Sequence, residues 1–264
     1  MRRHLRWLTL LPAAILAPAT SLLAQQDALP RPEDTEAWEP VPPVVDPGPF
    51  AGSPPPPSDA IVLFDGSSLD EWVNVDDDAP AGWQVRDGIV TVDKDAGNIM
   101  TRREFRDYQL HVEWRVPEDV TGEGQERGNS GLYMAFLGRD QGGYELQIVD
   151  SYENETYVNG MAGSVFKQSP PLVNAARPPG QWQSYDVVWT APSFSADGRL
   201  VTPARVTALF NGVLIQDGFE LKGETVYRGL PEYHPYEKAS IMLQAHGDPS
   251  PPISFRNIWL RELP

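Results

Sequence analysis

The sequence predicts an all-β fold, a sandwich of antiparallel sheets, and three observations support this prediction. From Ile61 onward, apolar and polar residues alternate in short runs such as YQLHVEWRV (108–116) and YELQIV (144–149). Asp-Gly and Asn-Gly pairs, such as Asp87-Gly88 and Asn211-Gly212, are typical of the tight turns that join antiparallel strands. No window keeps a 3.6-residue apolar period over the length of a helix.

Residues 1–24 have the features of an export signal. Three arginines precede an apolar run that ends in small or apolar residues, and we expect cleavage after Ala24. Pro12 and Pro18 interrupt this run, which falls short of the roughly 20 apolar residues of a comfortable membrane span. No later segment is long and apolar enough to span a membrane. The sequence therefore predicts a periplasmic or secreted protein with no membrane span after signal removal.

Residues 25–60 form a proline-rich linker in this interpretation. Eleven of the 27 prolines fall in this segment, which has almost no periodic apolar pattern. Such a composition favours polyproline II or disorder, because it offers little apolar surface for a core. We expect a disordered spacer between the N-terminus and the folded domain.

Residues 61–264 are predicted to form a single domain, because about 200 residues of short strands without repeats are typical of one sandwich. Two segments, 150–181 and 217–238, are long for sandwich loops. Long ordered loops often carry function, so we expect them to form the walls of a site. Most tryptophans on or beside the strands should be part of the core. The runs expected to be strands are 61–64, 82–92, 108–116, 131–136, 144–149, 184–191, 204–216, 239–246 and 253–263.

The charge and the cysteine count narrow the partners. The chain has 21 Lys and Arg against 37 Asp and Glu, and loss of the three signal arginines takes the formal net charge from −16 to −19. Such a chain repels phosphate backbones and anionic headgroups, so nucleic acid is not expected as a partner. With no cysteine, the chain has neither disulfides nor a lipidated cysteine. A neutral carbohydrate remains compatible with this charge.

One polar face is expected in the run YELQIV. Alternate residues of a strand share a face, so Glu145 and Gln147 point away from the side of Leu146 and Ile148. A glycosidase needs two carboxyls about 5 to 9.5 Å apart, but residue 147 is an amide. Asp150 falls on the opposite face and is expected to anchor the following turn. The carboxylate pair of laminarinase-type endoglucanases, whose strand this run resembles in layout, is thus incomplete.

A second polar face is expected near the C-terminus. In SIMLQAHG, Gln244 and His246 share one face, while Ile241, Leu243 and Ala245 share the other. If this strand lies near Glu145 and Gln147, two amides, a carboxyl and an imidazole converge. A solvated outer face of the sheet explains the same pattern. No G-x-S-x-G, H-E-x-x-H or phosphate-binding Gly-rich motif is present.

Several motifs, taken together in order over residues 61–263, resemble the 3-keto-disaccharide hydrolase family. They are LFDGSSLDEW (63–72), GWQVRDGIV (82–90), GNSGLYM (128–134), GYELQIVDSY (143–152), the loop 153–187, NGVLIQD (211–217) and LQAHGDPSPPISFRNIWLREL (243–263). The resemblance implies a concanavalin A-like jelly-roll sandwich with a sugar site on its concave sheet. It also implies cleavage of glycosides that carry a ketone at C3.

That chemistry needs one base and donors for an enolate oxygen, because a 3-ketone acidifies the hydrogen at C2 and permits elimination. From the resemblance, the candidate acid/base pair is Glu145 and His246, with the two roles unassigned. A divalent metal held by these two residues would also polarise the ketone. The candidate donors are Asn129, Gln147, Lys167, Gln244 and Arg256.

Two alternatives remain open at this point. One is a non-catalytic carbohydrate-binding module on a proline-rich stalk, and the other is an ordinary two-carboxylate glycosidase. The chain also departs from the family pattern, with Ala245 where an acid often precedes the final His-Gly and with GRDQGGYE (138–145) where a shorter approach is common. These departures bear on the choice of substrate.

Overall fold

The computed structural model describes residues 29–138 and 142–264, so the predicted export signal lies outside the described residues. Within them, helix is limited to three short 3-10 turns, η1 (Pro32–Thr35), η2 (Gly124–Glu126) and η3 (Val158–Gly160). None of the described helices could span a membrane. The fold is all-β, as predicted.

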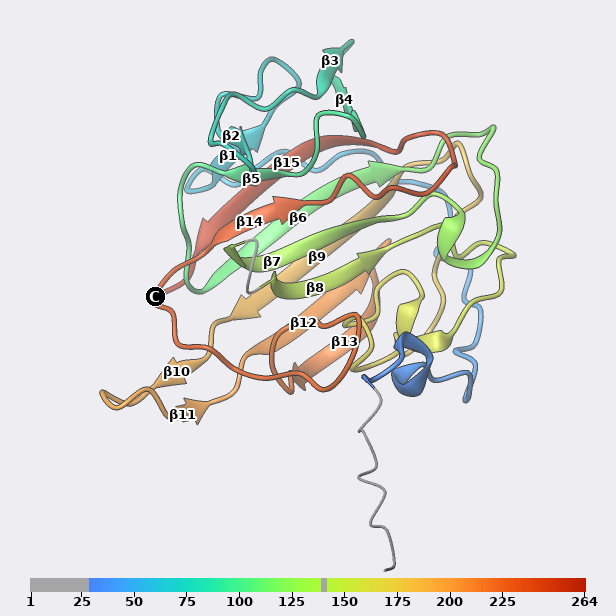
Figure 1. The fold of residues 1–264 in the computed structure, drawn as a ribbon. Helices are drawn as coiled ribbons and strands as arrows, with labels where there is room; N and C mark the ends of the chain where they lie inside the picture. Colours follow the sequence, from blue (N-terminus) through green and yellow to red (C-terminus); the bar gives the residue numbers. More distant parts are fainter. Residues whose placement is uncertain (1–28, 139–141) are drawn as a thin grey trace, which may run out of the picture.

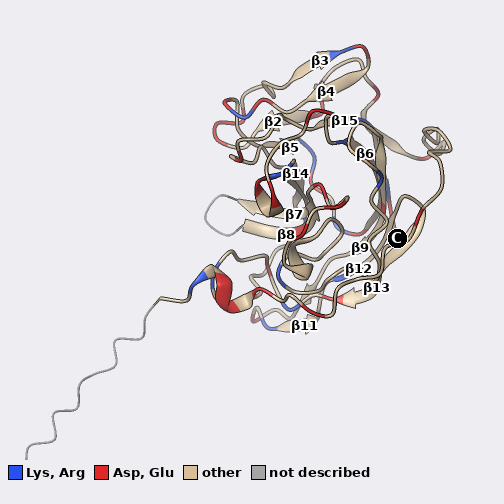
Figure 2. Cartoon of the chain, turned by 90° about the vertical axis from the view of Figure 1, so that its right-hand side faces the viewer, with Lys and Arg blue, Asp and Glu red and all other residues tan. Residues whose placement is uncertain are grey.

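Two antiparallel sheets lie face to face (Figures 1 and 2). The five-stranded sheet has the order β2 (Trp72–Asn74), β5 (Ile99–Thr101), β14 (Ser240–Leu243), β7 (Ser130–Gly138) and β8 (Gly142–Ile148). The eight-stranded sheet has the order β13 (Val213–Glu220), β12 (Arg205–Phe210), β9 (Gln183–Thr190), β6 (Tyr108–Arg115), β15 (Ser254–Glu262), β4 (Ile89–Thr91) and β3 (Gln84–Arg86), and β1 (Ile61–Phe64) pairs with β15. A ribbon of β10 (Ser193–Phe194) and β11 (Leu200–Thr202) extends from one end (Figure 1).

The core lies between the sheets and follows the alternation of the sequence. Trp114, Tyr185 and Phe210 of the large sheet are fully buried, and so are Leu132 and Leu146 of the small sheet. Because side chains of a strand alternate between its two faces, this inward set leaves the odd-numbered residues of β8 on the outer face of the small sheet.

Two buried tyrosines connect the sheets through hydrogen bonds. The Tyr108 hydroxyl on β6 donates to the carbonyl of Met134 on β7. The Tyr185 hydroxyl on β9 donates to the carbonyl of Gln147 on β8 at 2.8 Å. Each satisfies a polar group that would otherwise be costly to bury. The second bond fixes the backbone beneath one of the predicted site residues.

The proline-rich segment differs from the expected disordered spacer. Residues 29–57, here called the strap, lie along the domain. Asn159 is hydrogen-bonded to the strap at Thr35 and Ala37, and the backbone of Asn174 exchanges hydrogen bonds with Pro43 and Val45. Because proline has no N–H to donate, carbonyl groups of the strap such as that of Pro43 remain available to donors on the domain. Composition alone does not reveal those donors.

Candidate functional site

The polar face predicted for β8, with Glu145 and Gln147, is present and is shielded from solvent. Tyr133 on β7 lies opposite Glu145 in the register of the sheet, and both point away from the core residue Leu146. Residues 163–166 of the first long loop run along the edge of β8. There the backbone N–H of Gln147 donates to the Ser164 carbonyl at 2.9 Å. The polar face is therefore buried, with Glu145 only 4% exposed and Gln147 2% exposed.

The face beside His246 joins the same region because β14 is the neighbour of β7. The backbone N–H of Gln244 donates to the carbonyl of Gly131 at 3.0 Å, which extends the pairing of β14 with β7 past Leu243. Gly131 in turn lies opposite Gln147 of β8. The two predicted polar faces are thus adjacent, and Gln147 and Gln244 are separated only by a residue that has no side chain.

Gly131 provides the room between them. A Cβ atom added at Gly131 would lie 2.4 Å from a carboxyl oxygen of Glu145, closer than such atoms approach. A glycine at this position therefore lets the Glu145 carboxyl lie against the sheet.

These residues line a cavity of about 560 Å³. Glu145, His246, Asn129, Gln147 and Gln244, five of the seven predicted site residues, are part of its lining. The two long loops contribute Tyr157, Phe166, Thr225 and Tyr227, as the sequence analysis expected. The other lining residues are Glu36, Gln125, Glu126 and Tyr133.

Burial controls the protonation of Glu145. Loss of solvent raises the pKa of its carboxyl to about 8, although the hydrogen bond with Tyr133 acts in the opposite direction. The lining residues that the structure describes include no Lys or Arg to stabilise the anion. Glu145 is therefore mostly protonated at neutral pH, and it can donate a proton to an oxygen in the cavity.

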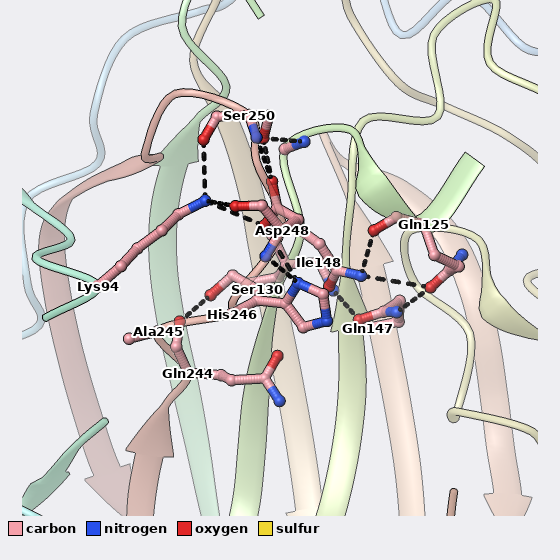
Figure 3. A network of polar contacts seen from close by, with 12 residues as sticks. Lys94, Gln125, Ser130, Gln147, Ile148, Gln244, Ala245, His246, Asp248 and Ser250 are labelled. Carbon is pink, nitrogen blue, oxygen red and sulfur yellow. Dashed lines mark hydrogen bonds and ion pairs between the residues drawn. The ribbon is translucent and has the colours of Figure 1, made fainter. Parts of the chain in front are cut away.

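His246 is oriented by a buried carboxylate (Figure 3). Its Nδ1 lies 3.1 Å from Oδ2 of Asp248, whose side chain is fully buried. Burial of the Asp248 carboxyl opposes its ionisation, but hydrogen bonds from His246, Ser250 and Lys94 outweigh burial and hold its pKa below the usual value. The Asp248 backbone N–H lies 3.2 Å from the same Nδ1, so this contact and the one to the carboxylate need different tautomers. In the tautomer with its proton on Nδ1, directed at the carboxylate, Nε2 is able to accept a proton.

Asp248 was not predicted. It follows His246 by two residues, and the run His-Gly-Asp was its only signal in the sequence. Strand alternation gave no reason to select it, because β14 ends at Leu243 and Asp248 belongs to the loop that follows.

The amide side chains of the cavity differ in how they are held. Gln147 donates to the Gln125 side chain at 2.9 Å, and Gln125 in turn donates to the Gly160 carbonyl at 2.8 Å. Asn129 donates to the Gln125 carbonyl at 2.8 Å. The Gln244 amide projects toward the same region as His246 and Gln147 (Figure 3), and within the described residues it makes no hydrogen bond. Gln244 is thus available to a ligand.

Two predicted donors lie outside the cavity lining. Arg256 is on β15 of the eight-stranded sheet, where its Nε bonds to Glu113 at 2.6 Å and its guanidinium lies 4.0 Å from the ring centre of Trp182. Alternation along a strand shows which residues share a face, but it does not show to which sheet the strand belongs. The position of Arg256 on the large sheet could therefore not be predicted. Lys167 is beside the cavity, but its ammonium donates to the carbonyls of Pro32 and Tyr227 at 2.6 and 3.1 Å.

Asp150, which was expected to anchor the turn after β8, is placed as predicted. Asp150 forms an ion pair with Arg127 at 2.7 Å and accepts a hydrogen bond from the Tyr152 backbone at 3.0 Å, so it anchors the turn. Glu153 and Glu155 are exposed. The further carboxyls of the cavity, Glu36 and Glu126, come from the strap and from η2, and neither was predicted.

The described residues contain no group of three or more His, Asp and Glu side chains arranged to hold a metal ion. Glu145 and His246 together would supply two ligands, whereas protein sites for divalent metals commonly use three or more. The donor set therefore does not fit a resident metal.

Comparisons with known proteins place the chain in a family of carbohydrate-active domains. The family described as the 3-keto-alpha-glucoside-1,2-lyase-like domain matches residues 59–261. A 3-keto-disaccharide hydrolase from Bacteroides thetaiotaomicron is 24% identical over an alignment of 240 positions, which covers 77% of this chain and 78% of that protein.

Solved structures from Parabacteroides distasonis also match. One, a candidate glycosyl hydrolase, is 50% identical with a TM-score of 0.75 and covers 88% of this chain and 96% of its own. A match over 88% of this chain is longer than residues 59–264 alone, so it includes part of the strap. A second candidate glycosyl hydrolase is 19% identical with a TM-score of 0.57, covers 78% of this chain and 94% of its own, and supports the fold alone.

Proposed function

Because the chain belongs to the family of 3-keto-alpha-glucoside-1,2-lyase-like domains, we propose that it is an exported enzyme that cleaves glycosides oxidised to a ketone at C3. One observation carries the proposal. A protonated, buried carboxyl, Glu145, and a carboxylate-backed imidazole, His246, line the same cavity. Elimination beside a ketone needs one acid and one base of this kind.

In the proposed reaction, Nε2 of His246 removes the proton from C2 of the sugar. The electron pair of that C–H bond forms a double bond to C3, and the negative charge moves to the ketone oxygen. An amide donor such as Gln244 can stabilise this enolate. The C1–O bond then breaks, and Glu145 donates its proton to the departing oxygen, which leaves as an alcohol.

The sugar product at this stage is an unsaturated ketone with a double bond between C1 and C2. Addition of water across that bond places the hydroxyl on C1 and a proton on C2, which gives a free 3-keto sugar. The sum of the two stages is hydrolysis. No oxocarbenium-like transition state is needed, so a second carboxylate is not required beside C1.

The test is release of aglycone from a 3-keto-glucoside, with the unoxidised glucoside as the control substrate. We expect cleavage of the first and none of the second. Replacement of hydrogen by deuterium at C2 should slow the reaction several-fold, since that bond breaks in the first step. Cleavage of the unoxidised glucoside, without any effect of deuterium at C2, would contradict the proposal.

A non-catalytic carbohydrate-binding module gives a different result in the same assay. It would retain a glycan unaltered and release no aglycone from either substrate.

A further inference from the structure

The strap reaches the cavity through one side chain. Glu36 follows η1, whose first turn is fixed by Pro32 and by the hydrogen bond from the Arg31 backbone to Asp34 at 2.9 Å. The backbone N–H of Glu36 donates to the Glu33 carbonyl at 3.2 Å, which closes the turn. The Glu36 side chain is then directed at the domain and lines the cavity with Glu145 and His246.

Three contacts hold this part of the strap in place. The Asn159 side chain pairs with both neighbours of Glu36, accepting from the Ala37 N–H and donating to the Thr35 carbonyl, each at 2.9 Å. The ammonium of Lys167, with its side chain only 3% exposed, donates to the Pro32 carbonyl at 2.6 Å. Trp38 packs edge-on against Tyr157 at 6.2 Å between ring centres. The backbone on both sides of Glu36, at Thr35 and at Ala37, is thus fixed to the domain.

The Glu36 carboxylate itself has no hydrogen bond within the described residues. Its side chain is 16% exposed, and its Oε1 lies 3.9 Å from Nζ of Lys167, beyond hydrogen-bond distance. The ion pair with Lys167 offsets part of the cost of burying this anion, but its oxygens still lack the hydrogen bonds that water would give them. The missing donor can come from a molecule in the cavity.

The chemistry of the lining limits what that molecule is. An ionised carboxylate only accepts hydrogen bonds, so its partner must donate, as a sugar hydroxyl does. The carboxylates of Glu36 and Glu126 line the cavity beside the protonated Glu145, with no Lys or Arg among the described lining residues. A uronic acid or a phosphorylated sugar would meet this like charge, and the nearby ammonium of Lys167 is already paired with Glu36 and bonded to the Pro32 and Tyr227 carbonyls.

We infer that the strap is part of the substrate site and that Glu36 binds a hydroxyl of a neutral sugar, so that the enzyme selects neutral over anionic saccharides. The inference rests on the proposed function for its substrate and adds a binding residue from outside the matched family domain, which begins at residue 59. Asn159 is the positioning residue for Glu36.

The experiment compares Glu36→Ala with Glu33→Ala in the full chain, on a neutral 3-keto-disaccharide. Glu33 is on the same turn but is exposed and does not line the cavity, so it is the matched control. Loss of one hydrogen bond to a charged group should raise KM about tenfold with little change in kcat. Glu36→Gln keeps a hydrogen-bond acceptor, so its KM should lie between those of the wild type and Glu36→Ala. Asn159→Ala should reproduce the rise in KM.

A uronate-containing 3-keto-disaccharide gives the second readout. Wild type should discriminate against it relative to the neutral substrate, and Glu36→Ala should reduce that discrimination. Equal KM values for Glu36→Ala and Glu33→Ala on an active enzyme would overturn the inference and leave the proposed function standing.

If the wild type cleaves no 3-keto substrate, a binding measurement can still test the role of Glu36 separately from the proposed function. Calorimetric titration with an unoxidised neutral disaccharide should show binding that weakens about tenfold in Glu36→Ala and not in Glu33→Ala. That result would support the role of Glu36 while the proposed function fails. Binding that is equal in both variants, or absent in all, would overturn the role of Glu36.

Discussion

Replacing Glu145 by glutamine should change how the stability of the protein depends on pH. The folded carboxyl has its pKa raised from 4.5 to about 8, chiefly by burial. Below pH 4.5 the group is protonated in both the folded and the unfolded chain. Between the two pKa values only the unfolded chain releases its proton, so the free energy of unfolding falls by about 1.4 kcal/mol per pH unit from this group.

The expected total is on the order of 5 kcal/mol between pH 4.5 and pH 8, after which both states are ionised and the loss stops. Glutamine has the shape of the protonated acid and does not titrate. The Glu145→Gln variant should therefore gain stability relative to wild type as the pH rises from 5 to 8.

Urea unfolding at each pH from 5 to 9 measures the difference between the two proteins. Because the other groups titrate equally in both proteins, the difference between their free energies of unfolding reports on residue 145 alone. Glu155→Gln, at an exposed position, gives the baseline for removal of one carboxyl from the surface. A difference between wild type and Glu145→Gln that stays constant from pH 5 to pH 8 would refute the account of a buried, protonated carboxyl.

Results are expected for four further variants. His246→Ala should lower kcat by about 10²- to 10⁴-fold in the aglycone-release assay, as loss of a general base does, and Asp248→Asn should lower kcat less while shifting its pH profile. Gly131→Ala should lower kcat by displacing the Glu145 carboxyl, since the new Cβ would lie 2.4 Å from it, and an unchanged kcat would show that the carboxyl position does not matter. Burial alone would lower the pKa of His111, but the hydrogen bonds that its ring donates to the carboxylates of Asp186 and Glu113 raise it from 6.5 to about 9. His111→Gln should therefore cost up to roughly 3 kcal/mol below pH 6.5, and this cost should disappear as the pH rises through 9; unfolding curves at pH 6 and pH 9.5 measure it.

The alternation of side chains along single strands was enough to predict which candidate site residues share a face. Because side chains on a strand alternate with a period of two, Glu145 with Gln147 and Gln244 with His246 could each be assigned to a common face. The sequence did not specify that β14 pairs with β7, which brings the two faces together. That pairing joins residues more than a hundred positions apart, and local patterns contain no information about it.

The residues that sequence reasoning missed lie in loops and in the strap. Asp248 comes after the end of β14, and Glu36 belongs to a segment whose composition predicts disorder. Lys167 was expected to bind substrate, but its ammonium joins the strap to the second long loop. For such residues, position depends on tertiary contacts, which neither periodicity nor composition encodes.

The strap has a consequence for the order in which the protein folds. Its residues leave the ribosome before the domain, yet Ala37 bonds to Asn159, 122 positions later, and Pro54 accepts a hydrogen bond from Asn257, 203 positions later. Contacts of such sequence separation form only after long loops have closed, which is slow. We therefore expect the sandwich to assemble first and the strap to dock afterwards. The wall formed by Glu36 would then be completed last, and a newly made chain would acquire its core before its full selectivity.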